Sequence, residues 1–221
     1  RVKQIQEWVY RQHIDTWERA GNLPRGLRED LSRDFHLRQG VLQEVIECDD
    51  QTKKLLLCWQ DGALTETVYI PEAERRTVCV STQVGCPVRC AFCASGLTGL
   101  ERSLEAGEIV EQLFRVQEQM EPGQRISHVV IMGMGEPLAN YENTLRAIRI
   151  LNAEWGLGIG ARHITVSTVG LPSAIRKLAQ EPMQITLAVS LHAATDALRE
   201  QLIPWAVKFK LKELFAAIEY Y

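Results

Sequence analysis

Short apolar strands alternate with amphipathic helices from residue 77 to the end of the chain. Strands are predicted at residues 77–82, 127–132, 163–168 and 184–190, and helices at residues 106–119, 141–152, 172–179, 196–201 and 211–221. Such alternation predicts an α/β domain with a parallel sheet. The predicted strands are too few to close a barrel, which takes roughly 250 residues. The pattern therefore favours a partial barrel, with a simple open sheet as the alternative.

Two shorter regions precede this alternation. In residues 1–39 apolar side chains recur at three- and four-residue spacings, which predicts a helical accessory domain. In residues 40–76 two apolar stretches, at 53–59 and 65–70, flank an Asp-Gly pair and so predict a short β-hairpin segment. The expected organisation is an accessory domain over 1–39, a hairpin segment over 40–76 and a partial barrel over 77–221.

The composition is that of an ordinary folded protein. Of the 221 residues 46% are hydrophobic and 24% are charged, with a formal net charge of −3, which excludes an intrinsically disordered chain. No stretch approaches the roughly 18 uninterrupted apolar residues of a membrane span, and the first residues lack the apolar core of a secretory signal. We expect a cytoplasmic protein without a membrane partner. The net charge argues weakly against a general nucleic-acid clamp.

The most informative motif is a run of three cysteines, Cys86, Cys90 and Cys93, in the loop after the first predicted strand. Loops at this end of the strands carry the sites of α/β folds. Three thiolates can hold three irons of a [4Fe–4S] cluster, so that the fourth iron stays open to a ligand. The alternative is a structural zinc site with Cys79 as the fourth ligand, although structural zinc usually takes its cysteines in two close pairs.

A second motif, centred on Gly135 and Glu136, follows the next predicted strand. Glycine at a strand end lets the backbone approach a ligand closely, and a carboxylate beside it can accept hydrogen bonds from an ammonium group. These residues suit the amino-acid end of S-adenosylmethionine. A phosphate-binding loop is the weaker interpretation, because a third glycine and a following lysine are missing.

Four segments resemble the motifs of one family, the RlmN/Cfr family of radical S-adenosylmethionine (SAM) RNA methyltransferases: CVSTQVGCPVRCAFC, VVIMGMGEPLANY, ITVSTVG and AVSLHA. The resemblance covers nearly the whole chain. It implies an α/β fold with a partial (βα)6 barrel and an N-terminal helical accessory domain. It also implies a [4Fe–4S] cluster on the three cysteines and S-adenosyl-L-methionine beside it, bound by Gly135, Glu136, Ser167, Ser190, Leu191 and His192.

The same resemblance implies a reaction. We expect methylation of C2 of an adenosine in 23S rRNA, with tRNA as a further candidate substrate; C8 methylation is not separated from it by the sequence. Glu66 matches the carboxylate that handles a proton, and Cys79 matches the resolving cysteine. The cysteine that carries the methyl group is expected beyond Tyr221, so this chain alone should not complete methyl transfer. An electron donor such as flavodoxin and a monomeric state are also expected.

Two other functions stay open at this point. One is another radical SAM enzyme such as a glycyl-radical activase, which would use the same barrel but has no need of Glu66 or Cys79. The other is a non-catalytic RNA-binding module held together by a metal such as zinc. Ala194, Trp205 and Ala206 depart from the family pattern, in segments that the resemblance puts near the cofactor.

Overall fold

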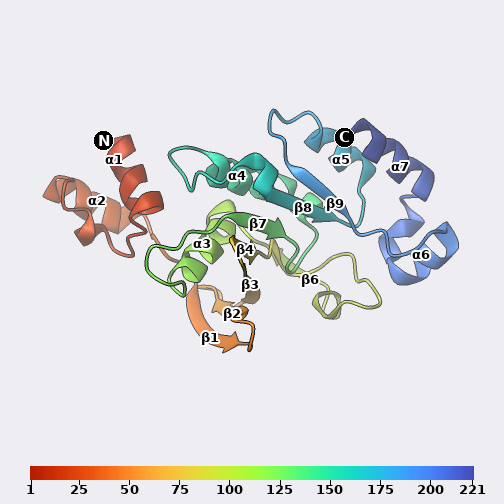
Figure 1. The fold of residues 1–221 in the computed structure, drawn as a ribbon, viewed down its shortest axis with the longest axis horizontal. Coiled ribbons are helices and arrows are strands. Elements are labelled where there is room, and N and C mark those ends of the chain that lie inside the picture. Colours follow the sequence, from red (N-terminus) through yellow and green to blue (C-terminus); the bar gives the residue numbers. More distant parts are fainter.

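The computed structural model describes residues 1–221 and contains one large mixed sheet (Figure 1). Its strands follow the spatial order β1-β2-β3-β4-β7-β8-β9. They are β1 Val41–Glu47, β2 Lys53–Cys58, β3 Leu64–Glu72, β4 Arg75–Cys79, β7 His128–Ile131, β8 Ile164–Thr168 and β9 Thr186–Val189. Neighbours pair antiparallel from β1 to β4 and parallel from β4 to β9. A second sheet consists of β5 Gln83–Gly85 and β6 Leu100–Ser103.

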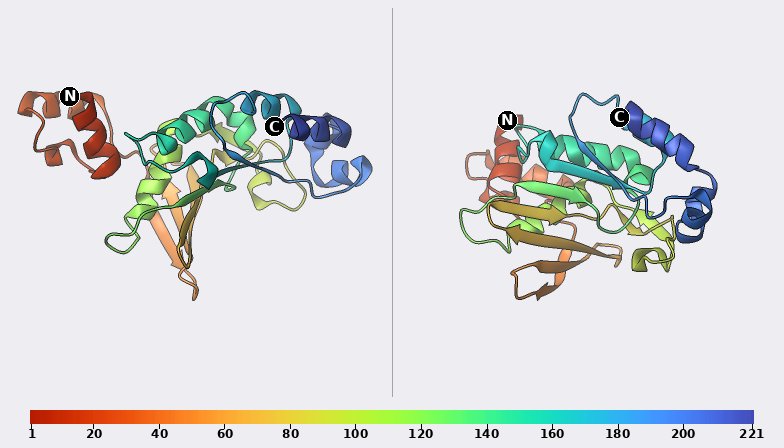
Figure 2. Two further views of the ribbon diagram at one scale, coloured as in Figure 1. Left: turned by 45° about the horizontal axis from the view of Figure 1, so that its top comes forward. Right: turned by 45° about the vertical axis from the view of Figure 1, so that its right-hand side comes forward.

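Helices cover one face of the large sheet (Figure 2). They are α3 Ala106–Gln117, α4 Tyr141–Asn152, α5 Pro172–Leu178 and α7 Leu211–Tyr220, with α6 Asp196–Leu202 following β9. Alternate strand residues form the core under these helices and are almost fully buried, among them Val78, Val129, Ile131, Ile164 and Val166. Side chains on the opposite face of β4, β7 and β8 are only partly buried. We call this second face the open face of the sheet.

The predicted α/β fold class is confirmed, with element ends shifted by a few residues. The predicted hairpin is present as β2 and β3. β3 also pairs with β4, so the hairpin is continuous with the large sheet. β1 is a strand that the pattern does not predict, since nearly all its side chains are exposed and its apolar residues do not alternate with polar ones.

Residues 1–39 form a small helical unit beside the sheet (Figure 2). It contains α1 Val2–Gln6, a π-helical turn at Glu7–Arg11, a 3-10 turn at Trp17–Arg19 and α2 Arg25–Asp34. Its own buried core consists of Ile14, Trp17, Ala20 and Leu23. The chain then enters β1 through Gln39 and Gly40, whose N–H groups donate to the buried carboxylate of Glu111 on α3. The division of the chain into three domains stays a prediction.

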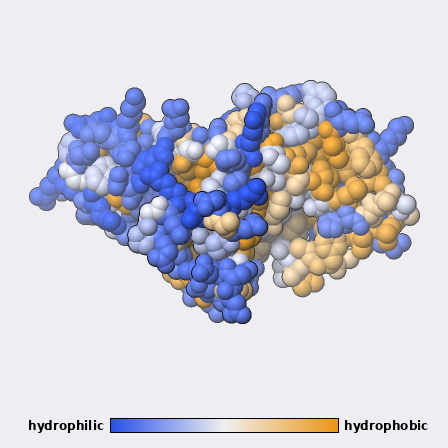
Figure 3. Space-filling view, in the orientation of Figure 1, coloured by the Kyte–Doolittle hydropathy of each residue, from blue (hydrophilic) through white to orange (hydrophobic).

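The two ends of the molecule differ in surface character. Apolar side chains gather over the end that carries α6, α7 and the loop before β6, whereas the end formed by residues 1–39 is mostly hydrophilic (Figure 3). Exposed apolar residues of the first of these ends include Phe92, Leu97, Leu198, Val207 and Phe215. No helix combines the length and the apolar character that crossing a bilayer would require.

Candidate active site

One cleft at the carboxyl ends of the parallel strands brings most of the predicted site residues together. Its walls come from the loop after β5, the turn after β7 and the ends of β8 and β9. The predicted residues that line it are Cys86, Cys90, Cys93, Gly135, Glu136, Ser167, Ser190 and His192. Leu191, Glu66 and Cys79 are not part of its lining. The position agrees with the general rule that α/β folds bind ligands at this end of the sheet.

The three cysteines lie in a loop of residues 86–99, the cysteine loop, which the β5–β6 pair closes. At its base the N–H of Cys86 donates to the carbonyl of Gly99 at 3.0 Å. Gly85 has a φ of +71°, and a Cβ there would lie 1.9 Å from the Gly99 carbonyl oxygen, so a side chain would collide. Within the loop, the N–H of Cys93 donates to the carbonyl of Cys90 at 3.1 Å. These contacts fix the loop with all three thiols at the cleft.

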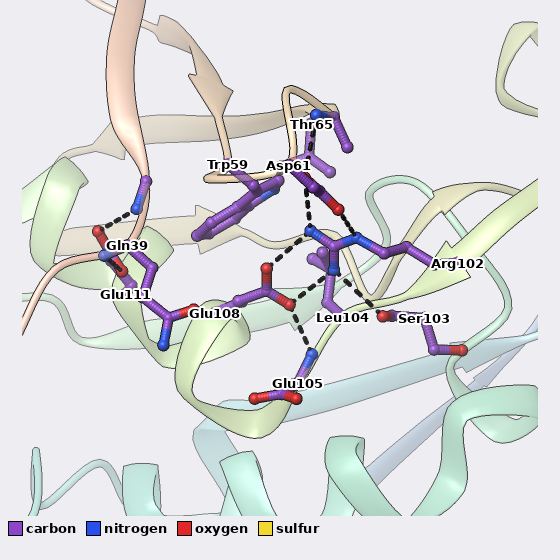
Figure 4. A network of polar contacts seen from close by, with 12 residues as sticks. Gln39, Trp59, Asp61, Thr65, Arg102, Ser103, Leu104, Glu105, Glu108 and Glu111 are labelled. Atoms are coloured by element: carbon purple, nitrogen blue, oxygen red, sulfur yellow. Dashed lines mark hydrogen bonds and ion pairs between the residues drawn. The ribbon is translucent and has the colours of Figure 1, made fainter. Parts of the chain in front are cut away.

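Arg102 on β6 anchors the base of the cysteine loop (Figure 4). Its guanidinium donates two hydrogen bonds to the carboxylate of Glu108 on α3, at 2.8 and 2.9 Å, and pairs with Asp61 in the β2–β3 turn. Glu108 also accepts the N–H of Glu105 at 2.8 Å, which caps the start of α3. The hydrogen bond from Arg102 is the main cause that lowers the pKa of Asp61. The loop base is thus tied to a turn and to a helix.

Burial and nearby negative charge oppose ionisation of the Cys86 and Cys90 thiols. Burial, together with Cys86 and Cys93, raises the pKa of Cys90 to about 11. A bound iron–sulfur cluster reverses this preference, because its positive irons stabilise thiolates. No three histidine, cysteine or carboxylate side chains are arranged to hold one metal ion. A cubane cluster makes a different demand, since each thiolate binds an iron of its own.

Glu136 is buried in the cleft wall, with 2% of its surface exposed. Its Oε1 accepts the N–H of Leu138 at 3.0 Å, and its Oε2 accepts the N–H of Val169 at 2.9 Å. The side chain therefore joins the turn after β7 to the turn after β8. Burial raises the pKa of Glu136, and these hydrogen bonds act in the opposite direction. Each oxygen retains a lone pair that a cationic ligand can use.

Two glycines bring the turn after β7 close to the segment after β4. A Cβ on Gly133 would lie 2.6 Å from Ser81 Oγ, and a Cβ on Gly135 would lie 2.6 Å from Gln83 Cβ. Gly135 also has a φ of +102°, which disfavours any side chain. The side-chain oxygen of Gln83 accepts the N–H of Glu136 at 2.9 Å. This close approach positions the Glu136 carboxylate in the cleft wall.

The ends of β8 and β9 contribute hydroxyls and an imidazole. The hydroxyl oxygens of Ser167 and Ser190 lie 3.3 Å apart. His192 has a left-handed backbone with φ +57°, and its ring centroid lies 4.4 Å from that of Phe92. Because Phe92 belongs to the cysteine loop, this contact joins two walls of the cleft. Leu191 packs against the hydrophobic core instead.

Glu66 and Cys79 lie on the open face of the sheet. Cys79 is paired opposite Val68, and Glu66 lies two residues before Val68 on β3, so both side chains point to the same face. The register across β7 and β8 puts Ser167 on that face as well. Lys54 pairs with Glu66 at 2.8 Å, and burial raises the pKa of Cys79. The open face thus runs from Glu66 towards the cleft.

Arg199 on α6 is a candidate that sequence reasoning missed. Only 1% of its surface is exposed, and it lies within electrostatic range of the Cys90 thiol. In the sequence it stands within an amphipathic stretch between Leu198 and Glu200, where an arginine is usually solvated. No local signal distinguishes it from a surface arginine, because its burial depends on how α6 packs.

A comparison with known families decides the class of the chain. The sequence profile of the radical SAM superfamily matches residues 80–220, which is more than half of the chain. The chain belongs to this superfamily. The matched region of this radical SAM protein contains the whole cysteine loop and every residue that lines the cleft. Three clustered thiols and the buried carboxylate of Glu136 fit the [4Fe–4S] cluster and S-adenosylmethionine that the superfamily generally uses.

Individual relatives match this radical SAM protein over nearly its whole length. A probable dual-specificity RNA methyltransferase RlmN 3 from Opitutus terrae is 46% identical and covers 99% of this chain and 63% of its own. A probable dual-specificity RNA methyltransferase RlmN from Clostridium tetani is 46% identical, with 100% and 63% covered. The crystal structure of a radical SAM methyltransferase from Sphaerobacter thermophilus has a TM-score of 0.93 at 45% identity, with 99% and 65% covered. The resemblance read from the motifs is confirmed, and the chain spans less than two thirds of these proteins.

Proposed function

We propose that this radical SAM protein takes part in methylating C2 of an adenosine in 23S rRNA, with tRNA as a second substrate. The observation that carries the proposal is the cleft in which Cys86, Cys90 and Cys93 lie with Glu136 at the carboxyl ends of the strands. The names of the relatives support RNA methylation over activation of a glycyl-radical enzyme. The choice of C2 and of these RNAs rests on the resemblance to the RlmN/Cfr family.

The substrate chemistry explains why a radical route is needed. C2 of adenine is bonded to hydrogen and is not a nucleophile, so polar methyl transfer from a sulfonium fails there. When bound, the [4Fe–4S] cluster and S-adenosylmethionine supply a 5′-deoxyadenosyl radical that can abstract a hydrogen atom. The protein then has to hold the cofactor, exclude water and move a proton.

The cleft residues are assigned to holding the cofactors. Cys86, Cys90 and Cys93 would hold the cluster. The remaining lone pairs of Glu136 would accept the methionine ammonium of S-adenosylmethionine, and the missing side chain of Gly135 leaves room for it. Three polar side chains are assigned to the rest of the cofactor, namely Ser167, Ser190 and His192. Leu191, between Ser190 and His192 in the sequence, would fix this turn by packing against the hydrophobic core.

The two residues of the open face are assigned to the RNA steps. Glu66 would accept the proton from C2, as a positioned carboxylate can. The Cys79 thiolate would attack the sulfur of the methyl-carrying cysteine, which is expected in the part of the relatives beyond this chain. The disulfide would form as the bond between that sulfur and the transferred carbon breaks, and the released carbon would take up a proton. The position of Glu66 and Cys79 on the same face of the sheet supports these two assignments, because both side chains could contact one bound base.

Partners and location complete the proposal. All six cysteines are free thiols, as expected in a reducing compartment such as the cytoplasm. An electron donor such as flavodoxin would reduce the cluster, and the chain would act as a monomer.

Anaerobic reconstitution with iron and sulfide tests the cofactor part. We expect a [4Fe–4S] EPR signal in the reduced chain that changes shape when S-adenosylmethionine is added, with release of 5′-deoxyadenosine. Cys93→Ala should lose the signal, whereas Cys48→Ala, at an exposed cysteine, should keep it. A chain that is folded by circular dichroism but whose cluster ignores S-adenosylmethionine would refute the proposal.

The RNA part is tested with the chain extended by the C-terminal remainder of the Opitutus terrae relative. Mass spectrometry of a 23S rRNA fragment should detect a methyl group at C2. Cys79→Ala and Glu66→Gln should abolish that product while 5′-deoxyadenosine release continues. Methylation that persists in both variants would refute the roles assigned to Cys79 and Glu66. Repeated methylation by the 221-residue chain alone would refute the proposal that the methyl-carrying cysteine lies outside this chain.

A further inference from the structure

Arg199 is a buried cation without a carboxylate partner. It is 1% exposed, and no acidic oxygen lies within ion-pair distance of its guanidinium. Its Nη2 donates to the carbonyl of Val169 and its Nη1 to the carbonyl of Phe209 at 3.2 Å, while its Nε has no acceptor in the protein. Burying an uncompensated charge is costly. An arginine in this position therefore points to an anion nearby.

The neighbouring acid attracts Arg199 but forms no ion pair with it. Asp196 lies on the same helix, but its carboxylate accepts the N–H of Leu211 at 2.8 Å. The Cys90 thiol would also attract the guanidinium once it is ionised, as it is when it binds iron. The cysteine loop also contacts α6 directly, because the N–H of Ala91 donates to the carbonyl of Leu202 at 2.9 Å.

Arg199 is also linked to the cofactor side of the cleft. The Val169 carbonyl that it binds belongs to the residue whose N–H donates to Glu136 Oε2 at 2.9 Å. Cys90 and Val169 both pack against one small buried cluster, which contains Cys86, Val88, Ile203 and Ala206. Helix α6 thus contacts the cysteine loop through Leu202 and the turn after β8 through Arg199.

We propose that Arg199 is a positioning residue for the iron–sulfur cluster, which compensates the negative charge of the cluster with its thiolates and holds the Val169 turn against Glu136. The inference rests on the cofactor part of the proposed function and not on the identity of the RNA. Three thiolates give a cubane a net negative charge, and reduction by one electron increases it. A fixed cation close by therefore favours the reduced form and raises the reduction potential.

Two variants separate charge from hydrogen bonding. Arg199→Gln removes the charge and keeps a donor, whereas Arg199→Lys keeps the charge and loses the planar fork. In the anaerobically reconstituted chain, an EPR-monitored redox titration should shift to a more negative midpoint potential in Arg199→Gln and stay at the wild-type value in Arg199→Lys. A chelator should strip iron from Arg199→Gln about tenfold faster than from the wild type. Arg146→Gln, at an exposed position of α4, is the matched control and should change neither.

A purely structural role would lower thermal stability in both variants without moving the potential, and this result would overturn the proposal. If Arg199→Gln does not fold by circular dichroism, Arg199→Met, which also removes the charge, is compared with Arg199→Lys: a more negative potential in Arg199→Met supports the proposal and equal potentials overturn it. A wild-type chain that takes up no cluster would instead refute the cofactor part of the proposed function. A wild-type cluster with an unshifted potential in Arg199→Gln would refute only the role of Arg199.

Discussion

At the scale of the single residue, the Glu136 carboxylate holds two turns together through its two oxygens. Its two oxygens each accept a backbone N–H, from Leu138 and from Val169. In Glu136→Gln one of these donors faces an amide NH2, and an unsatisfied buried donor costs about 1–3 kcal/mol. We expect urea unfolding of the cofactor-free chain to show a stability loss within that range. A variant as stable as the wild type would show that these bonds do not support the fold.

Gly135 gives a second prediction for one residue. Gly135→Ala places a Cβ 2.6 Å from Gln83 Cβ at a φ of +102°, and a left-handed backbone alone costs an alanine about 1–2 kcal/mol. We expect lower stability in urea and weaker binding of S-adenosylmethionine by the reconstituted chain. Gly107→Ala is the control, because a Cβ there meets no atom within 4 Å. Equal stability of the two variants would contradict the close-approach argument.

Residues whose chemistry needs a fixed spacing were predictable from the sequence. The three clustered cysteines and the Gly135–Glu136 pair meet in one cleft, as their loop positions suggested. Arg199 was not predictable, because only the packing of α6 decides that an arginine in an amphipathic stretch is buried. Leu191 shows the same limit: its neighbours in the sequence line the cleft, while its own side chain turns to the core.

At the scale of the element, the β5–β6 pair depends on Arg102. Arg102→Gln would leave the buried carboxylate of Glu108 without its cation, and we expect a loss of about 2 kcal/mol, since the arginine is partly solvated. The cysteine loop should then lose protection in hydrogen exchange before the large sheet does. Arg33→Gln is the control, because that arginine forms only exposed ion pairs. Uniform exchange across both sheets would argue against a local anchor.

The same contact predicts a pH dependence. The hydrogen bond from Arg102 holds the pKa of Asp61 below its ordinary value of 3.8. A carboxyl with a lowered folded-state pKa stabilises the fold fully above its unfolded pKa and loses that contribution as pH falls through the folded value. The stability difference between wild type and Arg102→Gln should therefore be constant above about pH 5 and shrink below pH 4. Urea midpoints measured from pH 7 to pH 3 check this, and a difference that grows on acidification would contradict it.

Elements with a clear period were predictable, and those without one were not. α3 to α7 and the parallel strands appear where apolar periodicity indicated them. β1 is missing from the prediction because its side chains face solvent, so that its backbone pairing with β2 leaves no hydrophobic signature. The junction of β3 with β4 likewise depends on backbone hydrogen bonds and not on composition, so the sequence does not show that the hairpin joins the large sheet.

At the scale of the whole molecule, one carboxylate joins the helical unit of residues 1–39 to the sheet. Glu111 accepts the N–H groups of Gln39 and Gly40 at 2.7 and 3.0 Å. Glu111→Ala should loosen this junction, because the buried N–H of Gly40 and the part-buried N–H of Gln39 lose their acceptor. We expect limited proteolysis to cut near residue 40 much faster while the fragment that starts at β1 survives. The control is Glu142→Ala, at an exposed ion pair, which should be cleaved at the wild-type rate. Cleavage of Glu111→Ala at the wild-type rate would show that the junction does not depend on this carboxylate.

The parallel pairing of β4 with β7 joins Thr77 to His128 across the whole cysteine loop. Contacts between residues so far apart form slowly, because the intervening chain must first be brought into a closed loop. During synthesis the ribosome releases Cys86, Cys90 and Cys93 before the strands and the helix that later surround them. The thiols of the nascent chain are therefore exposed to oxidants and to free metal ions before the surrounding elements have folded. For the proposed [4Fe–4S] cluster, iron and sulfide would therefore have to reach a chain whose synthesis is nearly complete.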